Sequence, residues 1–207
     1  MKYEWRKQEK NLYLPGQTPA FLEVPALNYI VIEGEGDPNG SLFDEKVGVL
    51  YALSYAIRMM PKKGHTPPGY FEYTVYPLEG EWSTKQRDSE PLDKSQFTYT
   101  IMIRQPDFVT PAVFEEAKQL TAKKVDPTLL EKARLEERRE GDVIQMLHLG
   151  SYDTEPASFE KMAAFAEQNG YTRLSKEHKE IYLSDPRKTD PDKLKTVLRI
   201  QVKKALL

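Results

Sequence analysis

Cysteine is absent from the 207 residues, and histidine is scarce, occurring only as His65, His148 and His178. Without thiols the chain can form no disulfide, no thiolate nucleophile and no cysteine-ligated zinc or iron–sulfur site. The three histidines are far apart in the sequence, and no two of them have the spacing of a zinc site. We therefore expect neither a metal ion nor a cofactor.

Long apolar runs and an excess of charge are also missing. No segment approaches the roughly 20 apolar residues that span a bilayer. The first residues, Met-Lys-Tyr-Glu-Trp-Arg, do not resemble a signal peptide. The 30 basic and 32 acidic residues nearly cancel, so composition gives no reason to expect nucleic acid as a partner. We expect a soluble cytoplasmic protein that binds neither membranes nor nucleic acids.

The first hundred residues predict a β-α-β-β order of elements. Ser41 can cap a helix after the Asp37-Pro38-Asn39-Gly40 turn, and Pro61 and Gly64 stop that helix. Runs rich in aromatic and β-branched residues predict strands on either side of it. The expected elements are a loop-like arm over 1–20, strands over 28–33, 70–78 and 97–104, a helix over 42–60 and a polar hairpin excursion over 83–95.

The middle of the chain predicts two helices in succession. Thr110-Pro111 and Asp126-Pro127 each combine a capping residue with a proline suited to the first helical position. Helix-forming residues then continue to Lys124 and to Arg139. The charged run 136–140 is most simply a solvated helix face, and a docking surface is the alternative. We expect 110–141 to be a connector.

The β-α-β-β order then returns, with strands over 142–149, 177–183 and 194–202 and a helix over 157–168. The sequence therefore predicts one α+β domain over 1–207, with a first half over 1–109 and a second half over 142–207. The halves would pair into one pseudo-two-fold antiparallel sheet. Helices would cover one face of that sheet, and a ligand cleft would lie on the other face, between the halves.

The strand near the C-terminus carries a carboxylate at its centre. With a period of two residues, His178, Glu180 and Tyr182 fall on one face, and Lys179 and Ile181 on the other. On a concave surface the carboxylate could meet a cation or a proton while the rings stack on a flat molecule. The alternative is an ordinary strand with one solvated face.

Four segments together carry a resemblance. They are Leu50-Tyr-Ala-Leu-Ser-Tyr55, Val75-Tyr-Pro-Leu-Glu-Gly-Glu-Trp82, Met146-Leu-His-Leu-Gly-Ser-Tyr152 and His178-Lys-Glu-Ile-Tyr182. In this order they resemble the GyrI-like small-molecule-binding family. The resemblance implies a duplicated β-α-β-β fold around an open ligand cleft, which occurs alone and as the effector domain of multidrug-sensing transcription activators.

Through the Leu-Tyr-x-Leu-Ser-Tyr and Pro-Leu-Glu-Gly-x-Trp segments the chain is most similar to a stand-alone branch of that family. This branch includes hydrolases that open the cyclopropane of DNA-alkylating antibiotics within an aromatic cage. Glu180 matches the cleft glutamate with which the activators meet cationic drugs. Ser83 departs from the pattern, because the branch often has a second aromatic residue there.

The resemblance assigns candidate roles to particular side chains. Glu180 could orient or deprotonate water, and a tyrosine hydroxyl could donate to a developing oxyanion, so the expected catalytic residues are Glu180 and Tyr182. The expected ligand-binding residues are Trp82, Tyr55, Tyr152, Glu79 and His178. Structural alternatives stand beside these roles: Trp82 as a packing residue, Glu79 in a turn or an ion pair, Tyr152 at a helix entry, and His178 bonded to backbone.

Three functions follow as hypotheses. The first is hydrolysis of flat, electrophilic aromatic compounds, and the second is binding of such compounds without turnover. The third is interaction with a protein such as a topoisomerase, for which the near-neutral charge gives no positive support. The sequence does not predict an oligomeric state.

Overall fold

A computed structural model describes residues 2–87 and 90–205. The described chain divides into two compact units. The first unit draws on residues 1–5 and 27–138, and the second unit draws on 6–26 and 139–207. Residues 6–26, expected as part of the first half, therefore group with the C-terminal part of the chain. The segment expected as a connector groups with the first unit up to residue 138.

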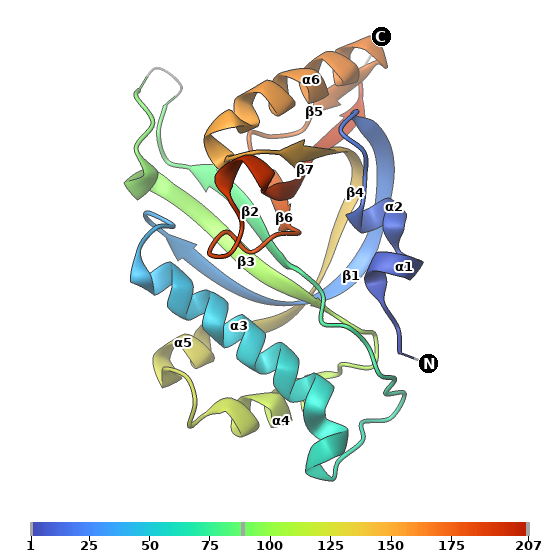
Figure 1. The fold of residues 1–207 in the computed structure, drawn as a ribbon, viewed down its shortest axis with the longest axis vertical. Coiled ribbons are helices and arrows are strands. Elements are labelled where there is room, and N and C mark those ends of the chain that lie inside the picture. Colours follow the sequence, from blue (N-terminus) through green and yellow to red (C-terminus); the bar gives the residue numbers. More distant parts are fainter. Residues whose placement is uncertain (1, 88–89, 206–207) are drawn as a thin grey trace. The chain divides into compact units, whose positions relative to one another are not determined.

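The first unit is built on three antiparallel strands, seen in Figure 1 with helix α3 running alongside them. Strand β3 is central, because it pairs with both β1 and β2. Ile101 of β3 lies opposite Ile32 on one side and Gly80 on the other. The elements are β1 (Ala20–Glu35, of which 27–35 belong to this unit), α3 (Ser41–Met59), η1 (Met60–Lys63), β2 (Leu78–Thr84), η2 (Lys94–Gln96), β3 (Phe97–Gln105), α4 (Pro111–Thr121) and α5 (Pro127–Lys132).

Helix α3 packs against β3 through one apolar stripe. Leu50, Leu53 and Ile57 recur at helical spacing, and all three are fully buried. The helix ends at Met59, and the short η1 turn follows with Pro61 as its second residue. Gly64 then takes a φ of 90°, a left-handed conformation that suits glycine. Ser41 is the first helical residue and Gly40 holds the capping position without a side-chain bond, so the predicted serine cap is wrong by one residue.

The strand predicted over 70–78 is wrong. Apart from an isolated bridge between Tyr3 and Tyr73, residues 70–77 have no strand structure, and β2 begins at Leu78. The aromatic residues of this run pack as a cluster instead: Tyr70 and Tyr73 contact Phe108 at ring distances of 5.2 and 5.9 Å. Pro77 also lacks the N–H that a paired strand needs. The residues that suggested a strand therefore serve side-chain packing.

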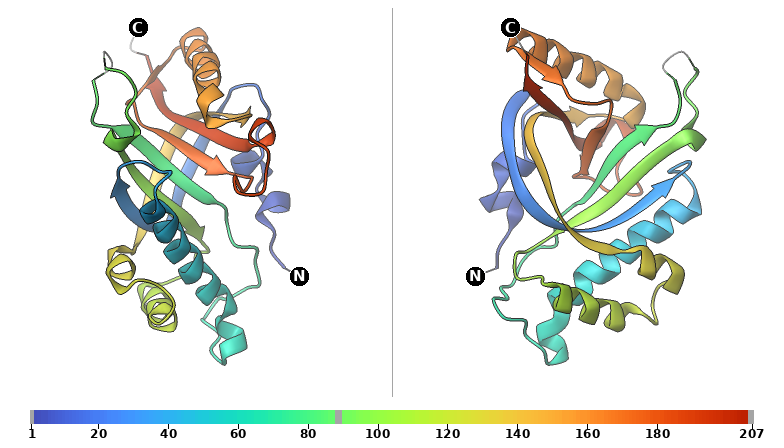
Figure 2. Two further views of the ribbon diagram at one scale, coloured as in Figure 1. Left: turned by 60° about the vertical axis from the view of Figure 1, so that its left-hand side comes forward. Right: turned by 180° about the vertical axis from the view of Figure 1, so that it is seen from behind.

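The second unit is built around strand β7, which pairs antiparallel with three other strands. Helix α6 lies beside β5 and β7 (Figure 2) and buries Met162 and Ala166 against Met146 and Leu198. The elements are α1 (Trp5–Gln8, whose Trp5 belongs to the first unit), α2 (Lys10–Tyr13), β4 (Arg134–Leu149, of which 139–149 belong to this unit), η3 (Tyr152–Thr154), α6 (Glu155–Gln168), β5 (Tyr171–Arg173), β6 (His178–Tyr182), η4 (Pro191–Lys193) and β7 (Lys195–Lys204).

The face of this sheet opposite α6 is not open. The N-terminal segment, expected as a loop-like arm, contains the short helices α1 and α2, and the Arg199 guanidinium donates to the Leu12 carbonyl. On the same face, Glu140 forms ion pairs with Lys179 at 3.0 Å and with Arg199 at 2.8 Å. In the second unit the predicted helix-free cleft face is therefore covered by chain.

The second connector helix is shorter than predicted. Helix α5 ends at Lys132, and the residues expected to continue it to Arg139 belong to strand β4. Residues two apart share one face of a strand, so Glu136 lies between Arg134 and Arg138 and bonds each at 2.9 Å. A composition typical of helices is overridden here by strand pairing and a row of ion pairs.

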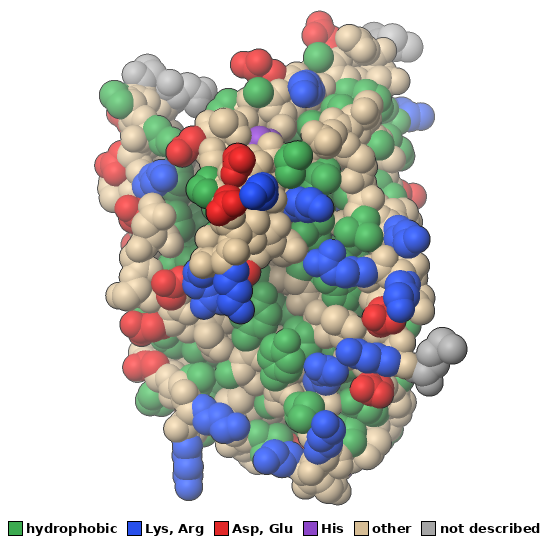
Figure 3. All heavy atoms as spheres, viewed as in Figure 1, with side chains coloured by type: hydrophobic (Ala, Val, Ile, Leu, Met, Phe, Trp, Pro, Cys, Tyr) green, Lys and Arg blue, Asp and Glu red, His purple; other side chains and the backbone are tan. Residues whose placement is uncertain are grey.

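The fold is thus α+β with antiparallel strands, and the β-α-β-β order occurs as β1-α3-β2-β3 and as β4-α6-β6-β7, with β5 added between α6 and β6. The pseudo-two-fold relation between the halves stays a prediction. None of the helices in residues 2–87 and 90–205 is long and apolar enough to cross a membrane. The face drawn in Figure 3 carries both acidic and basic side chains with apolar ones between them, which matches the balanced composition.

Candidate functional site

The alternation predicted for strand β6 determines which side chains meet. Glu180 lies opposite Leu198 of β7, and side chains of directly opposed residues share one face of an antiparallel pair. Leu198 belongs to the core beneath α6, so Glu180 lies on the helix-bearing face. The expectation of Glu180 on a helix-free face is wrong. Lys179, opposite Arg199, points to the face that the N-terminal segment covers.

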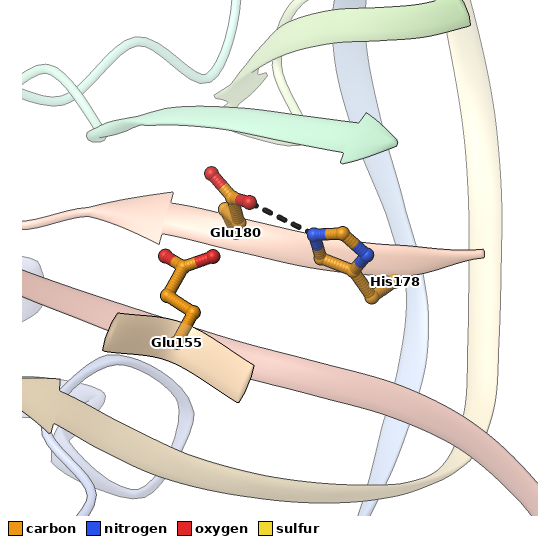
Figure 4. A group of neighbouring side chains, drawn as sticks. All are labelled: Glu155, His178 and Glu180. Atoms are coloured by element: carbon orange, nitrogen blue, oxygen red, sulfur yellow. Dashed lines mark hydrogen bonds and ion pairs between the residues drawn. The ribbon is translucent and has the colours of Figure 1, made fainter. Parts of the chain in front are cut away.

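Glu180 is surrounded by three polar side chains. His178 Nε2 donates to Glu180 Oε1 at 2.8 Å, and the Tyr182 hydroxyl donates to Oε2 at 2.7 Å. The third is Glu155, the first residue of α6, which has a carboxyl oxygen within 4.8 Å of the Glu180 carboxylate. Figure 4 shows Glu155 reaching toward strand β6 from helix α6, and His178 joined to Glu180 on the same strand.

The surroundings of Glu155 disfavour its ionised form. Burial and, to a smaller extent, the nearby carboxyl groups of Glu180 and Asp153 together raise the pKa of Glu155 to about 9. Glu155 is only 7% exposed, and its Oε1 is buried without a hydrogen-bond partner among the described residues. The raised pKa favours the protonated form of Glu155 at neutral pH.

Aromatic rings border the two carboxyl groups. Tyr152 meets Tyr182 edge to face at a ring distance of 6.2 Å, and Phe159 meets the His178 imidazole at 4.8 Å. Burial raises the pKa of Tyr152 to about 12, helped by the charges of Glu180 and Glu155. Tyr152 is nevertheless 38% exposed, so this side of the cluster is reachable from solvent. We call these six residues the carboxyl site: Tyr152, Glu155, Phe159, His178, Glu180 and Tyr182.

The same donors could in principle hold a metal ion. Ligand atoms of Glu155, His178 and Glu180 all lie within 4.8 Å of one another. One imidazole and two carboxylates suit a divalent cation, but the Glu155 proton would first have to leave. Without a metal ion, the site offers Glu180 as a hydrogen-bond acceptor, Glu155 as an acid and the aromatic rings as flat walls.

A groove of about 850 Å³ lies elsewhere in the second unit. Leu147 and Leu183 line it together with the charged side chains of Arg6, Asp185 and Lys195. None of the carboxyl-site residues lines it, and Leu147 lies on the strand face opposite to that of Glu180. The groove and the carboxyl site are therefore separate features.

Trp82 lies in the first unit, in a cluster of aromatic rings. Its ring lies 5.1 Å from Tyr99, 5.8 Å from Phe43 and 6.1 Å from Phe97. Gly34 makes room for this cluster, since a Cβ there would lie 2.4 Å from the Tyr99 ring. Trp82 therefore has the contacts of a packing residue, which was the alternative to a ligand-binding role. Its ligand-binding role stays a prediction.

The remaining predicted residues lie apart from these rings. Glu79 is three residues before Trp82, so strand alternation places it on the opposite face of β2, where it is fully buried. Tyr55 is 47% exposed on α3 and stacks on Tyr51 at 6.4 Å. The structure therefore brings together the predicted residues of the second unit, Tyr152, His178, Glu180 and Tyr182. It adds two that the sequence reasoning missed, Glu155 and Phe159.

Comparison with known proteins gives a consistent assignment. A family model described as the GyrI-like small molecule binding domain matches residues 17–203. Two Listeria innocua crystal structures each cover 98% of this chain and 100% of their own. One, a hydrolase, has 35% identity and a TM-score of 0.89, and the other, an uncharacterized conserved protein, has 38% identity and a TM-score of 0.89.

A more distant structure shares the fold alone. The C-terminal domain of EcmrR has 13% identity and a TM-score of 0.51, covering 91% of this chain and 98% of its own. The comparison with curated proteins found no significant match.

Proposed function

Because the chain belongs to the family of GyrI-like small-molecule-binding domains, we propose that it binds flat aromatic compounds at the carboxyl site and hydrolyses them. The proposed substrates are DNA-alkylating antibiotics with a cyclopropane conjugated to a dienone, and the proposed role is detoxification, hence drug resistance. The observation that carries this proposal is Glu180, an 8% exposed carboxylate held by His178 and Tyr182 between aromatic side chains. The similar hydrolase from Listeria innocua supports a catalytic role.

The chemistry needs a base, an acid and a flat binding surface. Water attacks a cyclopropane carbon, the carbon–carbon bond breaks, and its electron pair moves through the dienone to the carbonyl oxygen, which takes up a proton. Glu180 is the proposed base, because a carboxylate can accept the proton that water loses. Tyr152, Tyr182 and Phe159 are the proposed walls, each ring pair adding about 0.5–1.5 kcal/mol to ligand binding.

Tyr182 has a more specific part than the sequence suggested. Its hydroxyl donates to Glu180 at 2.7 Å, so it orients the carboxylate in the absence of ligand. A substrate carbonyl would have to compete with Glu180 for this hydroxyl before Tyr182 could donate to an oxyanion. We therefore propose Tyr182 mainly as the residue that fixes the direction of the base.

Turnover of a spirocyclopropane dienone, followed by ultraviolet absorbance, tests this proposal. Hydrolysis of many equivalents by the purified protein is the expected result. A spectral change that stops at one equivalent would contradict catalysis. It would favour the second candidate, a non-catalytic binding or sequestering protein, in which the Glu180 carboxylate offers a counter-charge to cationic compounds.

Replacement of Trp82 tests whether the family's aromatic cage includes this residue. Trp82→Leu is expected to weaken a planar ligand by about 1–2 kcal/mol in calorimetry, because a stacking surface is lost. Phe97→Leu is the matched control, since it removes a ring from the same cluster. Unchanged affinity of a folded Trp82→Leu protein would leave Trp82 as a packing residue beside Phe43 and Tyr99.

A further inference from the structure

The N-terminal segment covers the helix-free face of the second unit over only part of its length. Along β4, Gln145 on this face is buried and donates to the Asn11 carbonyl at 2.7 Å. Leu147 is half-buried, and Leu149 is 46% exposed. Residues two apart share one face of a strand, so these three side chains form one row whose far end is open. The groove of about 850 Å³ lies at this open end.

The groove has an apolar floor. Its apolar lining residues are Leu14, Pro15, Leu147, Leu149 and Leu183. Leu14 is 36% exposed, so two large apolar side chains of the lining, Leu14 and Leu149, face water. The volume falls in the range of roughly 300–1,000 Å³ that is typical of small-molecule sites, and an apolar lining with a few polar groups is typical of them as well.

Hydrogen bonds fix both walls of the groove. On one side the Gly16 carbonyl accepts from the Leu147 N–H at 2.8 Å, which holds the N-terminal segment to β4. On the other side the Leu183 N–H donates to the Lys195 carbonyl at 3.0 Å, and the Arg6 guanidinium donates to the Leu183 carbonyl at 3.2 Å. The left view of Figure 2 shows the loop that follows β6 beside the short N-terminal helices. A groove that is already formed costs little ordering when it binds a ligand.

The charged residues of the lining are mostly cations. They are Arg6, Lys188, Lys193 and Lys195 against Asp185 and Asp192. The Arg187 guanidinium holds the Asp185 carboxylate through two bonds of 3.0 Å. Lys195 lies directly opposite Leu149 in the β4–β7 pair, so its side chain shares the face of the apolar floor. Within residues 2–87 and 90–205, Lys195 forms no ion pair.

We propose that this groove is a second binding site, which takes a small organic carboxylate with an apolar body. The apolar body covers Leu147 and Leu149, and the carboxylate meets the Lys195 ammonium in a charge-assisted hydrogen bond. Four positive against two negative lining charges leave two positive charges in excess, which attract a monoanion and repel cations. The site lies on the sheet face opposite to that of Glu180, so the proposal goes beyond the proposed hydrolysis and does not rest on it.

Leucine-methyl NMR of the full chain, titrated with octanoate, tests this proposal. The methyl signals of Leu147, Leu149 and Leu183 are expected to shift in a saturable manner. Those of Leu174, which is 51% exposed and outside the groove, should stay in place. Octanol has the same chain without the charge, and we expect it to bind about fivefold more weakly, because it forms no ion pair with an exposed lysine. Unshifted groove leucines would overturn the proposal, as would equal affinity for octanol and octanoate.

Two substitutions separate the charge from the apolar floor. Lys195→Glu is expected to lower octanoate affinity by about tenfold and to leave octanol binding unchanged, because repulsion replaces attraction. Its control is Lys161→Glu, a charge reversal at an exposed position of α6 outside the groove. Leu149→Ser should weaken both ligands by about fivefold, because apolar contact area is lost, and Leu174→Ser is its control. An octanoate affinity that Lys195→Glu leaves unchanged, or that Lys161→Glu lowers equally, would contradict the proposal.

Glu180→Gln separates this inference from the proposed function. Octanoate binding by this variant should equal that of the native protein, because the groove and the carboxyl site share no residue. Loss of octanoate binding in Glu180→Gln, or displacement of octanoate by the spirocyclopropane dienone, would place the octanoate at the carboxyl site and overturn the second site. Absence of dienone turnover together with the expected leucine shifts would remove the hydrolase and support the groove.

Discussion

Glu180→Gln is expected to lower the turnover of a spirocyclopropane dienone by about 100-fold or more while binding of a neutral planar ligand survives. The amide has the shape of the carboxyl group and keeps one acceptor oxygen for Tyr182 or His178, but it cannot accept a proton from water. Initial rates by absorbance and affinity by calorimetry, measured on the same folded protein, separate the two effects. Glu160→Gln on α6 is the control for a change of charge outside the carboxyl site.

The same variant distinguishes a base from a counter-charge. If Glu180 serves to attract cations, Glu180→Gln should weaken cationic planar ligands by about 1–3 kcal/mol and leave neutral ones unchanged, with no turnover to lose. Loss of binding to both kinds of ligand would contradict either role. It would show that Glu180 supports the fold through His178, Tyr182 and Glu155.

The sequence predicted which side chains of β6 share a face, but not which face the rest of the chain covers. A period of two residues places His178, Glu180 and Tyr182 together, and the structure agrees. Which face is covered depends on helix α6 and on the N-terminal segment, whose Leu12 lies 187 positions from Arg199. No local pattern near Glu180 carries that information.

Secondary-structure propensity gave wrong predictions where side-chain packing determines the backbone conformation. The aromatic run 70–77 has the composition of a strand, yet its rings gather around Phe108, and Pro77 cannot supply a strand donor. The charged run from Arg134 has the composition of a helix, yet its alternating signs suit a strand equally well. The pairing of strand β4 decides between a helix and a strand for this charged run.

Glu155 was missed for a different reason. An acidic residue at the start of a helix is ordinary, because the positive end of the helix dipole favours it. Its unusual feature is the contact with Glu180, which lies 25 positions later on another element. A sequence signal for such a pair would have to come from coupled variation of the two residues in relatives.

The second large effect is expected at the ion cluster on the other side of β6. Lys179 and Arg199 are 3% and 2% exposed, and Glu140 is the carboxylate that binds both, at 3.0 and 2.8 Å. Burial alone would raise the pKa of Glu140, but the two cations hold it below its ordinary value. The stabilisation by Glu140 is therefore present above that ordinary value and is lost as the pH falls through the lower, folded-state pKa.

Glu140→Gln is expected to lower the free energy of unfolding by about 3–5 kcal/mol at neutral pH, because two buried cations lose the carboxylate that neutralises them. The matched control is Glu136→Gln, four residues earlier on the same strand. Its arginine partners are 46% and 27% exposed, and its expected cost is about 0–1 kcal/mol. Urea unfolding of both variants between neutral and acid pH provides the measurement, and their difference should shrink as Glu140 of the native protein becomes protonated. Equal costs for the two variants at neutral pH would contradict this account. They would mean that the Gln145 and Leu12 oxygens, which also accept from Arg199, are sufficient to hold that guanidinium without Glu140.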